Sequence, residues 1–338
     1  MTDLSTSPRR RRVLILGTNG RFGLAAAQAF DAAGWDVLAQ VRRTPAAGMP
    51  TRARVVALPL ADVDGLVAQA AGADVVVHAV NPHYTRWAAD LLPMGRQGMG
   101  IAERLGARFA LPGNVYNYGA AMPATLDGRT PQWPSTRKGR LRVAFEDELR
   151  HRAPRLRSVI LRAGDFFGAG RGVWFDQVVV KGVARGRLAY PGTRTLAHAW
   201  AYLPDMARAL VGLCELAELP PFIDIPLPGA TLTGEQLMDA VEAVARGAGL
   251  GGARPFRRGG APWPLFRLLA LVIPLWREIG EMRYLWETPH GLDGAALARW
   301  LPAFRPTPLP VALRASLDEL GLTPGRPAAA PALAPARR

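Results

Sequence analysis

The feature that most constrains the fold of this chain is a set of three glycines. They are spaced three residues apart and directly follow a short apolar run. Residues 13–16 are Val-Leu-Ile-Leu, and four consecutive apolar residues are typical of a strand buried on both faces. Gly17, Gly20 and Gly23 follow, and apolar residues then recur at helical spacing up to Gly34, which suits a helix C-cap. The sequence therefore predicts a strand, a glycine turn and a helix in direct succession.

This succession places backbone N–H groups and the positive end of a helix where they can bind a pyrophosphate. The glycines of such a turn allow a tight bend, close approach of the backbone to the phosphates and close packing of the helix on the strand. A turn that only introduces a core helix is the structural alternative, because a glycine triplet alone has low specificity. We predict a bound dinucleotide, held by the residues of the turn: Gly17, Asn19, Gly20, Arg21, Phe22 and Gly23.

The end of the second predicted strand distinguishes between the two nicotinamide coenzymes. Residues 35–41 read as this strand, and it ends in Arg42 and Arg43, about twenty residues past the glycine turn. An acidic residue there would hydrogen-bond the ribose 2′-hydroxyl of NAD, whereas an arginine complements a 2′-phosphate. Arg42 therefore favours NADP over NAD, with two solvated arginines at a strand end as the structural alternative.

Further strands are expected over residues 54–58, 74–80, 108–111 and 157–162, alternating with helical patterns. Strands that alternate with helices at this spacing predict an α/β fold with a Rossmann-type, doubly wound parallel sheet and a smaller C-terminal α/β substrate lobe. The expected boundaries are a disordered basic tail over 1–12, a Rossmann domain over 13–165 with a return segment near 196–215, a substrate lobe over 166–195 and 216–322, and a disordered tail over 323–338.

Several short motifs follow the glycine turn. Asp62 comes after the third predicted strand, and Tyr118-Gly119 comes after the fifth. Residues 162–168 read Arg-Ala-Gly-Asp-Phe-Phe-Gly, and residues 201–205 read Ala-Tyr-Leu-Pro-Asp. In this order and spacing the motifs resemble the extended short-chain dehydrogenase/reductase superfamily, in particular the NAD(P)-dependent epimerase/dehydratase family, over about residues 13–320.

The resemblance implies an oxidoreductase or epimerase/dehydratase-like enzyme that exchanges hydride between a nicotinamide coenzyme and a carbonyl or alcohol. Asp62 would hydrogen-bond the adenine. Asp165 and His198 would contact the substrate, although sugar-nucleotide epimerases carry a phosphate-gripping arginine where His198 stands, which weakens the case for a nucleotide-sugar substrate. The residues that would flank the cofactor after the fourth and fifth strands are Ala79, Val80, Asn81 and Pro112.

The catalytic positions depart from the family pattern. The family has Ser or Thr where this chain has Asn114, an amide that can donate a hydrogen bond but cannot relay a proton as a hydroxyl does. The family's proton donor is a Tyr with a Lys four residues later, and residues 131–142 contain no tyrosine. Two registers stay open, because either Thr136 and Arg140 or Lys138 and Arg142 can occupy the two positions.

A proton shuttle works best when its pKa lies near the operating pH. Lys138 could serve if its surroundings lowered its pKa, and Tyr116 could supply a phenol from the neighbouring loop. The candidate catalytic residues are therefore Asn114, Tyr116 and Lys138, with packing as the alternative role for Tyr116 and a contact with the cofactor as the alternative for Lys138. The missing Tyr also motivates a second hypothesis, a non-catalytic NAD(P)-binding sensor or scaffold.

The amino-acid composition limits the kinds of partner that we expect this chain to bind. The formal net charge is +15, but the arginines are spread along the chain without a nucleic-acid-binding signature, so specific nucleic-acid binding is not expected. The histidines lack metal-ligand spacing and there is no Gly-x-Ser-x-Gly elbow, so we expect neither a metal site nor a serine hydrolase. One cysteine and no transmembrane segment favour a cytoplasmic protein with a small-molecule substrate, and a homodimer is left open.

The apolar stretch over residues 265–286 belongs to no motif. Pro274 is expected to kink it. We expect it to form a lid or dimer surface of the smaller lobe, with shallow membrane contact as the alternative.

Overall fold

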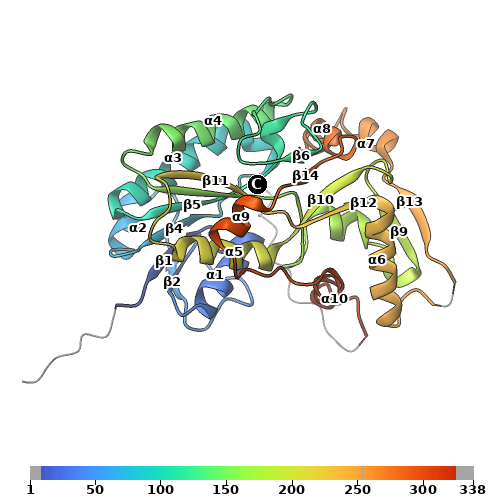
Figure 1. Cartoon of the computed structure of the whole chain (residues 1–338), viewed down its shortest axis with the longest axis horizontal. Coiled ribbons are helices and arrows are strands. Elements are labelled where there is room, and N and C mark those ends of the chain that lie inside the picture. Colours follow the sequence, from blue (N-terminus) through green and yellow to red (C-terminus); the bar gives the residue numbers. More distant parts are fainter. Residues whose placement is uncertain (1–8, 253, 325–338) are drawn as a thin grey trace, which may run out of the picture.

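The computed structural model describes residues 9–252 and 254–324. Its main sheet has seven parallel strands in the order β11-β7-β5-β4-β1-β2-β3 (Figure 1). This confirms the predicted doubly wound sheet, with the strand order reversing between β1 and β4. The strands are β1 (Arg12–Leu16), β2 (Asp36–Val41), β3 (Arg54–Ala57), β4 (Val75–His78), β5 (Arg108–Gly113), β7 (Ser158–Arg162) and β11 (Phe222–Pro226).

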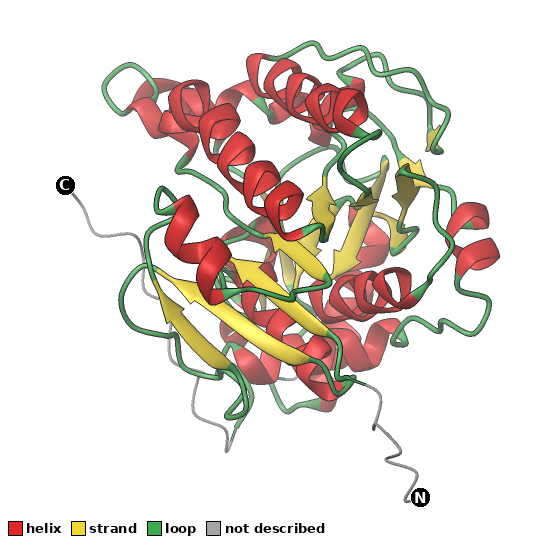
Figure 2. Cartoon of the chain, turned by 90° about the vertical axis from the view of Figure 1, so that its left-hand side faces the viewer, coloured by secondary structure: helices red, strands yellow, loops and turns green. Residues whose placement is uncertain are grey.

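Helices cover both faces of this sheet because its central strands are apolar on both sides (Figure 2). Val13 and Ile15 of β1 lie in the core beneath α1 and α5, whereas Leu14 and Leu16 lie in the core on the opposite face. The helices on the first face are α1 (Arg21–Ala32) and α5 (Leu203–Glu215), and those on the second are α2 (Val63–Gln69), α3 (Trp87–Leu105) and α4 (Arg137–Arg152).

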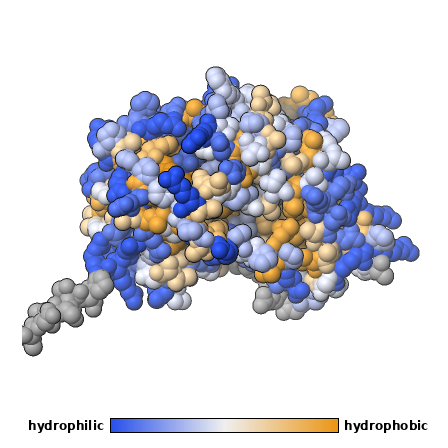
Figure 3. All heavy atoms as spheres, in the orientation of Figure 1, coloured by the Kyte–Doolittle hydropathy of each residue, from blue (hydrophilic) through white to orange (hydrophobic). Residues whose placement is uncertain are grey.

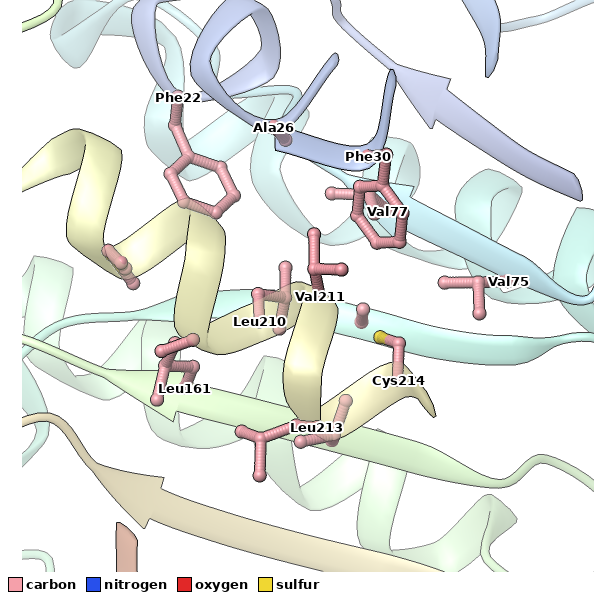
Figure 4. Close-up of a cluster of buried hydrophobic side chains, with 14 of the residues drawn as sticks. Phe22, Ala26, Phe30, Val75, Val77, Leu161, Leu210, Val211, Leu213 and Cys214 are labelled. Atoms are coloured by element: carbon pink, nitrogen blue, oxygen red, sulfur yellow. The ribbon is translucent and has the colours of Figure 1, made fainter. Parts of the chain in front are cut away.

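The contact between α1 and α5 fixes the start of α1, where the glycine turn ends. Phe22 and Phe30 of α1 face Leu210 and Cys214 of α5 across a packed cluster (Figure 4). Burial raises the pKa of Cys214 to about 12, so this thiol is a core side chain and not a nucleophile.

The smaller lobe has its own core, built around Trp200, Trp263 and Trp286. Its strands form a three-stranded sheet and two short pairs: β12-β10-β8, β13-β9 and β14-β6. Their bounds are β6 (Thr125–Leu126), β8 (Asp165–Phe167), β9 (Arg187–Tyr190), β10 (Ala197–Tyr202), β12 (Ala230–Thr233), β13 (Arg257–Gly260) and β14 (Gly291–Leu292). The remaining helices are α6 (Gly234–Gly247), α7 (Trp263–Leu269), α8 (Pro274–Glu281), α9 (Ala295–Trp300) and α10 (Leu309–Glu319).

Three segments belong to a different part of the molecule from the one we expected. β11, which we expected in the smaller lobe, pairs with β7 over five residues and forms the edge of the main sheet. β10 pairs with β8 and β12, so only α5 of the return segment joins the main sheet. Arg12 begins β1 instead of ending a tail, because it is paired with Asp36 of β2 in the parallel sheet. Residues 1–8 and 325–338 of the two expected tails lie outside the described residues.

The apolar stretch forms two short helices, α7 and α8, followed by a 3₁₀ turn, η5 (Arg283–Trp286). Pro274 lies in the first turn of α8, where a missing N–H costs nothing, so it starts a helix instead of kinking one. No helix within the described ranges is long and apolar enough to span a bilayer.

Candidate functional site

The glycine turn has the backbone geometry that a phosphate cradle needs. Gly17 has a φ of +79°, and a Cβ atom added there would lie 3.1 Å from Val80. A Cβ atom at Gly23 would lie 2.4 Å from the carbonyl oxygen of Gly17. Gly20 is the N-cap of α1 and supplies no side chain, so the positive end of the helix is left open.

Arg21 follows the turn and places a positive charge within electrostatic range of Tyr84 and Asp176. Its Nη1 is buried and has no hydrogen-bond partner in the part of the chain that the structure describes. Burial lowers the pKa of Arg21, while Asp176 and Tyr84 act in the opposite direction. A buried guanidinium N–H without a partner is suited to bind an anionic oxygen. Phe22, by contrast, packs into the core, so only its backbone can reach a ligand (Figure 4).

Asn19 ties the glycine turn to the segment that follows β2. Its Nδ2 donates to the carbonyl of Thr44 and its Oδ1 accepts from the amide of Ala46, both at 2.8 Å. Arg42 lies exposed at the start of this segment and makes no ion pair or hydrogen bond with any described residue. The Asn19 side chain therefore holds in place the backbone from which Arg42 extends.

The ends of β1 and β4 meet beside the glycine turn. Ala79 donates its amide to Leu16 at 2.9 Å, Val80 contacts Gly17, and Asn81 is exposed. The predicted cofactor residues of these two strand ends are thus adjacent. Asp62 is the N-cap of α2, and its Oδ1 accepts from Gly65 at 3.0 Å. The hydrogen bond that we predict between Asp62 and the adenine of a coenzyme remains to be tested.

Asn114 follows β5 at the same edge of the sheet. Its Oδ1 accepts from the amide of Tyr116 at 3.1 Å, which leaves the amide NH₂ group as a donor. Its backbone carbonyl accepts from Arg162, whose buried guanidinium also pairs with Glu146 and Asp224. This buried ion triad fixes the loop that carries Asn114.

Tyr116 belongs to a 3₁₀ turn, η2 (Tyr116–Tyr118), and its hydroxyl lies 2.9 Å from that of Tyr84. Tyr84 comes from η1 (Tyr84–Arg86), the turn between β4 and α3. Burial is the main cause that raises the pKa of both phenols, so both are protonated at neutral pH. Tyr118 is buried with Arg162 over its ring at 5.4 Å, which is a packing role.

Lys138 is completely buried at the start of α4. Its Nζ donates to the carboxylate and the backbone carbonyl of Glu278 and to the carboxylate of Glu281, at 2.7 Å in the last case. These contacts use all three of its N–H donors. As described, Lys138 joins α4 to α8 and has no N–H left for a substrate or a ribose.

Arg142 lies one turn further along α4 than Lys138. Unlike Lys138, it contacts the end of β5 and the start of α3. Its Nη2 donates to the carbonyl of Pro112 at 3.2 Å, and its guanidinium lies 5.7 Å from the ring centre of Trp87. Its Nε is buried without a partner among the described residues. Burial lowers the pKa of Arg142, with Glu146 opposing that effect. A donor of this group is thus available beside Tyr84 and Tyr116.

Asp165 and His198 form a pair on neighbouring strands of the smaller sheet, with 2.7 Å between Oδ2 and Nε2. The ring of His198 stacks on Trp286 at 4.3 Å and meets His290 edge-on at 4.5 Å. Burial lowers the pKa of His290 to about 4, so this ring is neutral. The two predicted substrate residues therefore act as one unit against an aromatic wall.

Sequence reasoning missed several residues of this region because their roles depend on distant partners. Gln40 bridges the amide of Gly17 and the carbonyl of Leu58 with its side-chain amide, at 2.8 and 2.6 Å. Glu278 and Glu281 are spaced i, i+3, which puts both on one face of α8 and could have indicated a shared cation. Others gave no comparable signal: Tyr84, Asp176, Trp286 and His290.

The structure resembles those of sugar-nucleotide enzymes. A UDP-glucose 4-epimerase from Thermotoga maritima, solved with UDP-glucose, is 14% identical, with a TM-score of 0.69 over 92% of this chain and 98% of that one. A nucleoside-diphosphate-sugar epimerase from Pseudomonas aeruginosa is 18% identical, with a TM-score of 0.67 over 93% and 98%. An NAD-dependent NDP-hexosamine 5,6-dehydratase of tunicamycin biosynthesis is 15% identical, with a TM-score of 0.66 over 91% and 97%.

These similarities show that the chain has the fold of the NAD(P)-dependent epimerases and dehydratases, as the sequence motifs predicted. No protein-family model matches the sequence. No match to a curated protein was found either. Because one fold serves many activities, the function of this chain depends on the chemistry of its own site.

Proposed function

We propose that this chain is an NADP-dependent oxidoreductase of the epimerase/dehydratase type, acting on a carbonyl or alcohol group of a small to medium-sized polar substrate. The observation that carries the proposal is the open N-terminus of α1 at a glycine turn that admits no side chain, next to a polar site at the ends of β4 and β5. The NAD-dependent dehydratase with the same fold supports a nicotinamide coenzyme at this turn.

The residues at the turn fit such a coenzyme. The backbone of Gly17, Gly20 and Gly23 leaves room for a pyrophosphate, and the free Nη1 of Arg21 can bind one of its oxygens. Arg42 is exposed and unpaired within the described ranges, as a group awaiting a 2′-phosphate should be. Asp62, Ala79, Val80, Asn81 and Pro112 complete the proposed cofactor site. When bound, the coenzyme would supply or accept the hydride.

The proton is assigned to Tyr116. Burial raises the pKa of Tyr116, so the phenol holds its proton at neutral pH, and it would donate this proton to the oxygen of a carbonyl substrate once positive charge from the bound coenzyme and Arg142 has lowered that pKa. Tyr84, whose hydroxyl lies 2.9 Å from that of Tyr116, would donate a hydrogen bond to the phenolate that remains after the transfer. The amide NH₂ group of Asn114 would orient the substrate oxygen, and Arg142 would take the position of the family's Lys. Lys138 can handle the proton only if Glu278 and Glu281 release it.

The rest of the substrate would meet the Asp165–His198 pair. The carboxylate can accept hydrogen bonds from hydroxyl groups, and the stacked ring of Trp286 supplies an apolar wall. The epimerase with the same fold was solved with UDP-glucose. By the family resemblance, however, His198 stands where sugar-nucleotide epimerases carry an arginine that grips the nucleotide phosphate. We therefore propose a polar substrate without a nucleotide.

A non-catalytic NAD(P)-binding protein is the second candidate. The observation that favours it is the capture of Lys138 in ion pairs, together with the lack of a tyrosine over residues 131–142. Such a protein would bind the coenzyme and transmit its redox state to a partner. It would do so without consuming the reduced form.

Two measurements on the purified full chain test these proposals. Calorimetry with NADP, NADPH, NAD and NADH should give heat for all or some of them, strongest for the phosphorylated pair. The absorbance of NADPH should then fall in the presence of a member of a panel of aldehydes and ketones. Binding without turnover over a broad panel would support the sensor, and no binding of any coenzyme would overturn both candidates.

A further inference from the structure

A cluster of exposed aliphatic side chains lies at the junction of α7 and α8, which we call the α7–α8 tip. It holds five of the eight large apolar side chains that are exposed in the described ranges, and Leu271 and Val272 are 75% and 78% exposed. The other three, Val55, Trp133 and Val311, are scattered. The tip consists of Leu265, Leu268, Leu271, Val272 and Ile273.

The tip is held in place from its inner side. Trp263 of α7 is buried and donates its indole N–H to the carbonyl of Pro191 at 2.5 Å. Phe266 of α7 stacks on Trp276 of α8 at 4.2 Å with an interplanar angle of 23°. With their inner residues packed in this way, the two helices present the aliphatic side chains outward. The α7–α8 tip lies at the upper edge of the molecule, where apolar surface is visible (Figures 1 and 3).

The exposed charged side chains that flank the tip are both positive. Arg267 and Arg277 flank it, and both are exposed without an ion pair or hydrogen bond to any residue that the structure describes. The acidic side chains of the segment are Glu278 and Glu281, and both are turned toward Lys138 on α4. An aliphatic surface edged by free guanidinium groups complements a layer that is apolar inside and anionic at its face.

We propose that the α7–α8 tip docks the protein on anionic lipid bilayers. The five aliphatic side chains would enter the boundary between headgroups and acyl chains, and Arg267 and Arg277 would contact lipid phosphates. The helices span seven and eight residues, so the contact is superficial and does not cross the bilayer. The formal net charge of +15 would strengthen the approach to such a surface.

A second copy of the chain fits the tip less well. Five side chains expose on the order of a few hundred Å², below the roughly 800 Å² that each partner buries in a stable complex. A symmetric contact through the tip would also bring its arginines against those of the other copy. Charge and size therefore both favour a lipid surface.

Flotation of the full chain with vesicles tests the proposal. Wild-type protein should float with vesicles of phosphatidylcholine and phosphatidylglycerol at roughly 0.15 M salt, and much less with phosphatidylcholine alone. Val272→Asp should reduce the bound fraction at least about tenfold. Val311→Asp is the matched control, because Val311 is also an exposed valine, 56% exposed, on α10. It should float like the wild type, and equal unfolding midpoints would show that both variants are folded.

Three results would overturn the proposal. The wild type does not float with anionic vesicles, or Val272→Asp and Val311→Asp float equally well, which would indicate general adsorption of a basic chain. The third is a dimer in solution that Val272→Asp converts to a monomer, with no effect on flotation. Coenzyme binding is measured separately, so failure here leaves the proposed function standing.

Discussion

Arg42 is one exposed side chain whose removal should change the choice of coenzyme. Arg42→Ala should weaken NADPH binding by a factor of about 10–100, because a charge-assisted hydrogen bond contributes about 1.5–3 kcal/mol. NADH lacks the 2′-phosphate, so its binding should change little. Calorimetry with both coenzymes measures the difference.

Arg129→Ala is the control for this experiment. Arg129 is also exposed, and its substitution changes the net charge equally while lying on a different loop. It should leave both affinities unchanged. Equal losses of NADPH and NADH binding in Arg42→Ala would contradict the 2′-phosphate contact.

Tyr116 and Tyr118 stand on the same 3₁₀ turn and offer a matched pair of substitutions. Tyr116→Phe removes the hydroxyl that meets Tyr84, and a lost general acid is expected to lower kcat by about 10²–10⁴ with little change in coenzyme affinity. Tyr118→Phe keeps the ring beneath Arg162 and should retain kcat. If both variants turn over like the wild type, the proton comes from another group.

At the scale of elements, Lys138 decides how α4 and α8 are joined. Lys138→Met leaves Glu278 with Arg137 as its remaining cation and Glu281 without one. Breaking a fully buried pair typically costs about 3–5 kcal/mol of unfolding free energy, and the loss here should be smaller because both carboxylates are partly exposed or still paired. Neutralising both partners in a triple variant, with Glu278→Gln and Glu281→Gln, should restore most of that stability. Denaturant unfolding measures each step.

The same triple variant separates two roles for Lys138. If Lys138 only holds α8, turnover should return with stability. A triple variant that is as stable as the wild type but inactive would show that Lys138 itself transfers the proton, contrary to its assignment to Tyr116.

β4 ends in His78, a buried ring between Phe109 and Phe145. Burial, with Arg142 as the second cause, lowers its pKa to about 3. The unfolded chain therefore binds a proton that the folded chain rejects, so stability should fall as the pH drops below about 6.5. Between pH 7 and pH 5 this histidine should account for a loss of about 2 kcal/mol.

His78→Leu should flatten this pH dependence by that amount when unfolding by urea is compared at the two pH values. His83→Leu is the control, because His83 is exposed at the turn before Tyr84. An unchanged slope in His78→Leu would mean that His78 is protonated in the folded protein.

Sequence patterns gave the main elements correctly where local signals sufficed. The apolar runs of β1 and β4 predicted two strands, which the structure pairs with each other, and the glycines after β1 predicted the turn that leads into α1. The position of β11 in the main sheet could not be predicted from local patterns, because it depends on pairing with β7, which is distant in the sequence. The ion pairs of Lys138 and the Tyr84–Tyr116 contact likewise join residues far apart in the sequence, so the predicted role of Lys138 did not include its carboxylate partners.

For the whole molecule, coenzyme binding should appear as stability. A ligand that binds only the folded chain at about 100 times its Kd adds about 2.7 kcal/mol to the unfolding free energy. NADPH should therefore raise the thermal midpoint more than NADH at equal concentration. The same midpoint with and without either coenzyme would argue against a preformed dinucleotide site.

The place of β11 has a consequence for how the protein is made. β11 covers the outer edge of β7 and brings Asp224 to the buried guanidinium of Arg162, although it follows β7 by some sixty residues. While β11 has not yet been synthesised, the backbone of β7 is unpaired at the edge of the sheet. The guanidinium of Arg162 then also lacks one of its two carboxylate partners. Truncated N-terminal halves should therefore be prone to aggregate, and the half that carries the main sheet should mature only after much of the downstream lobe has been synthesised.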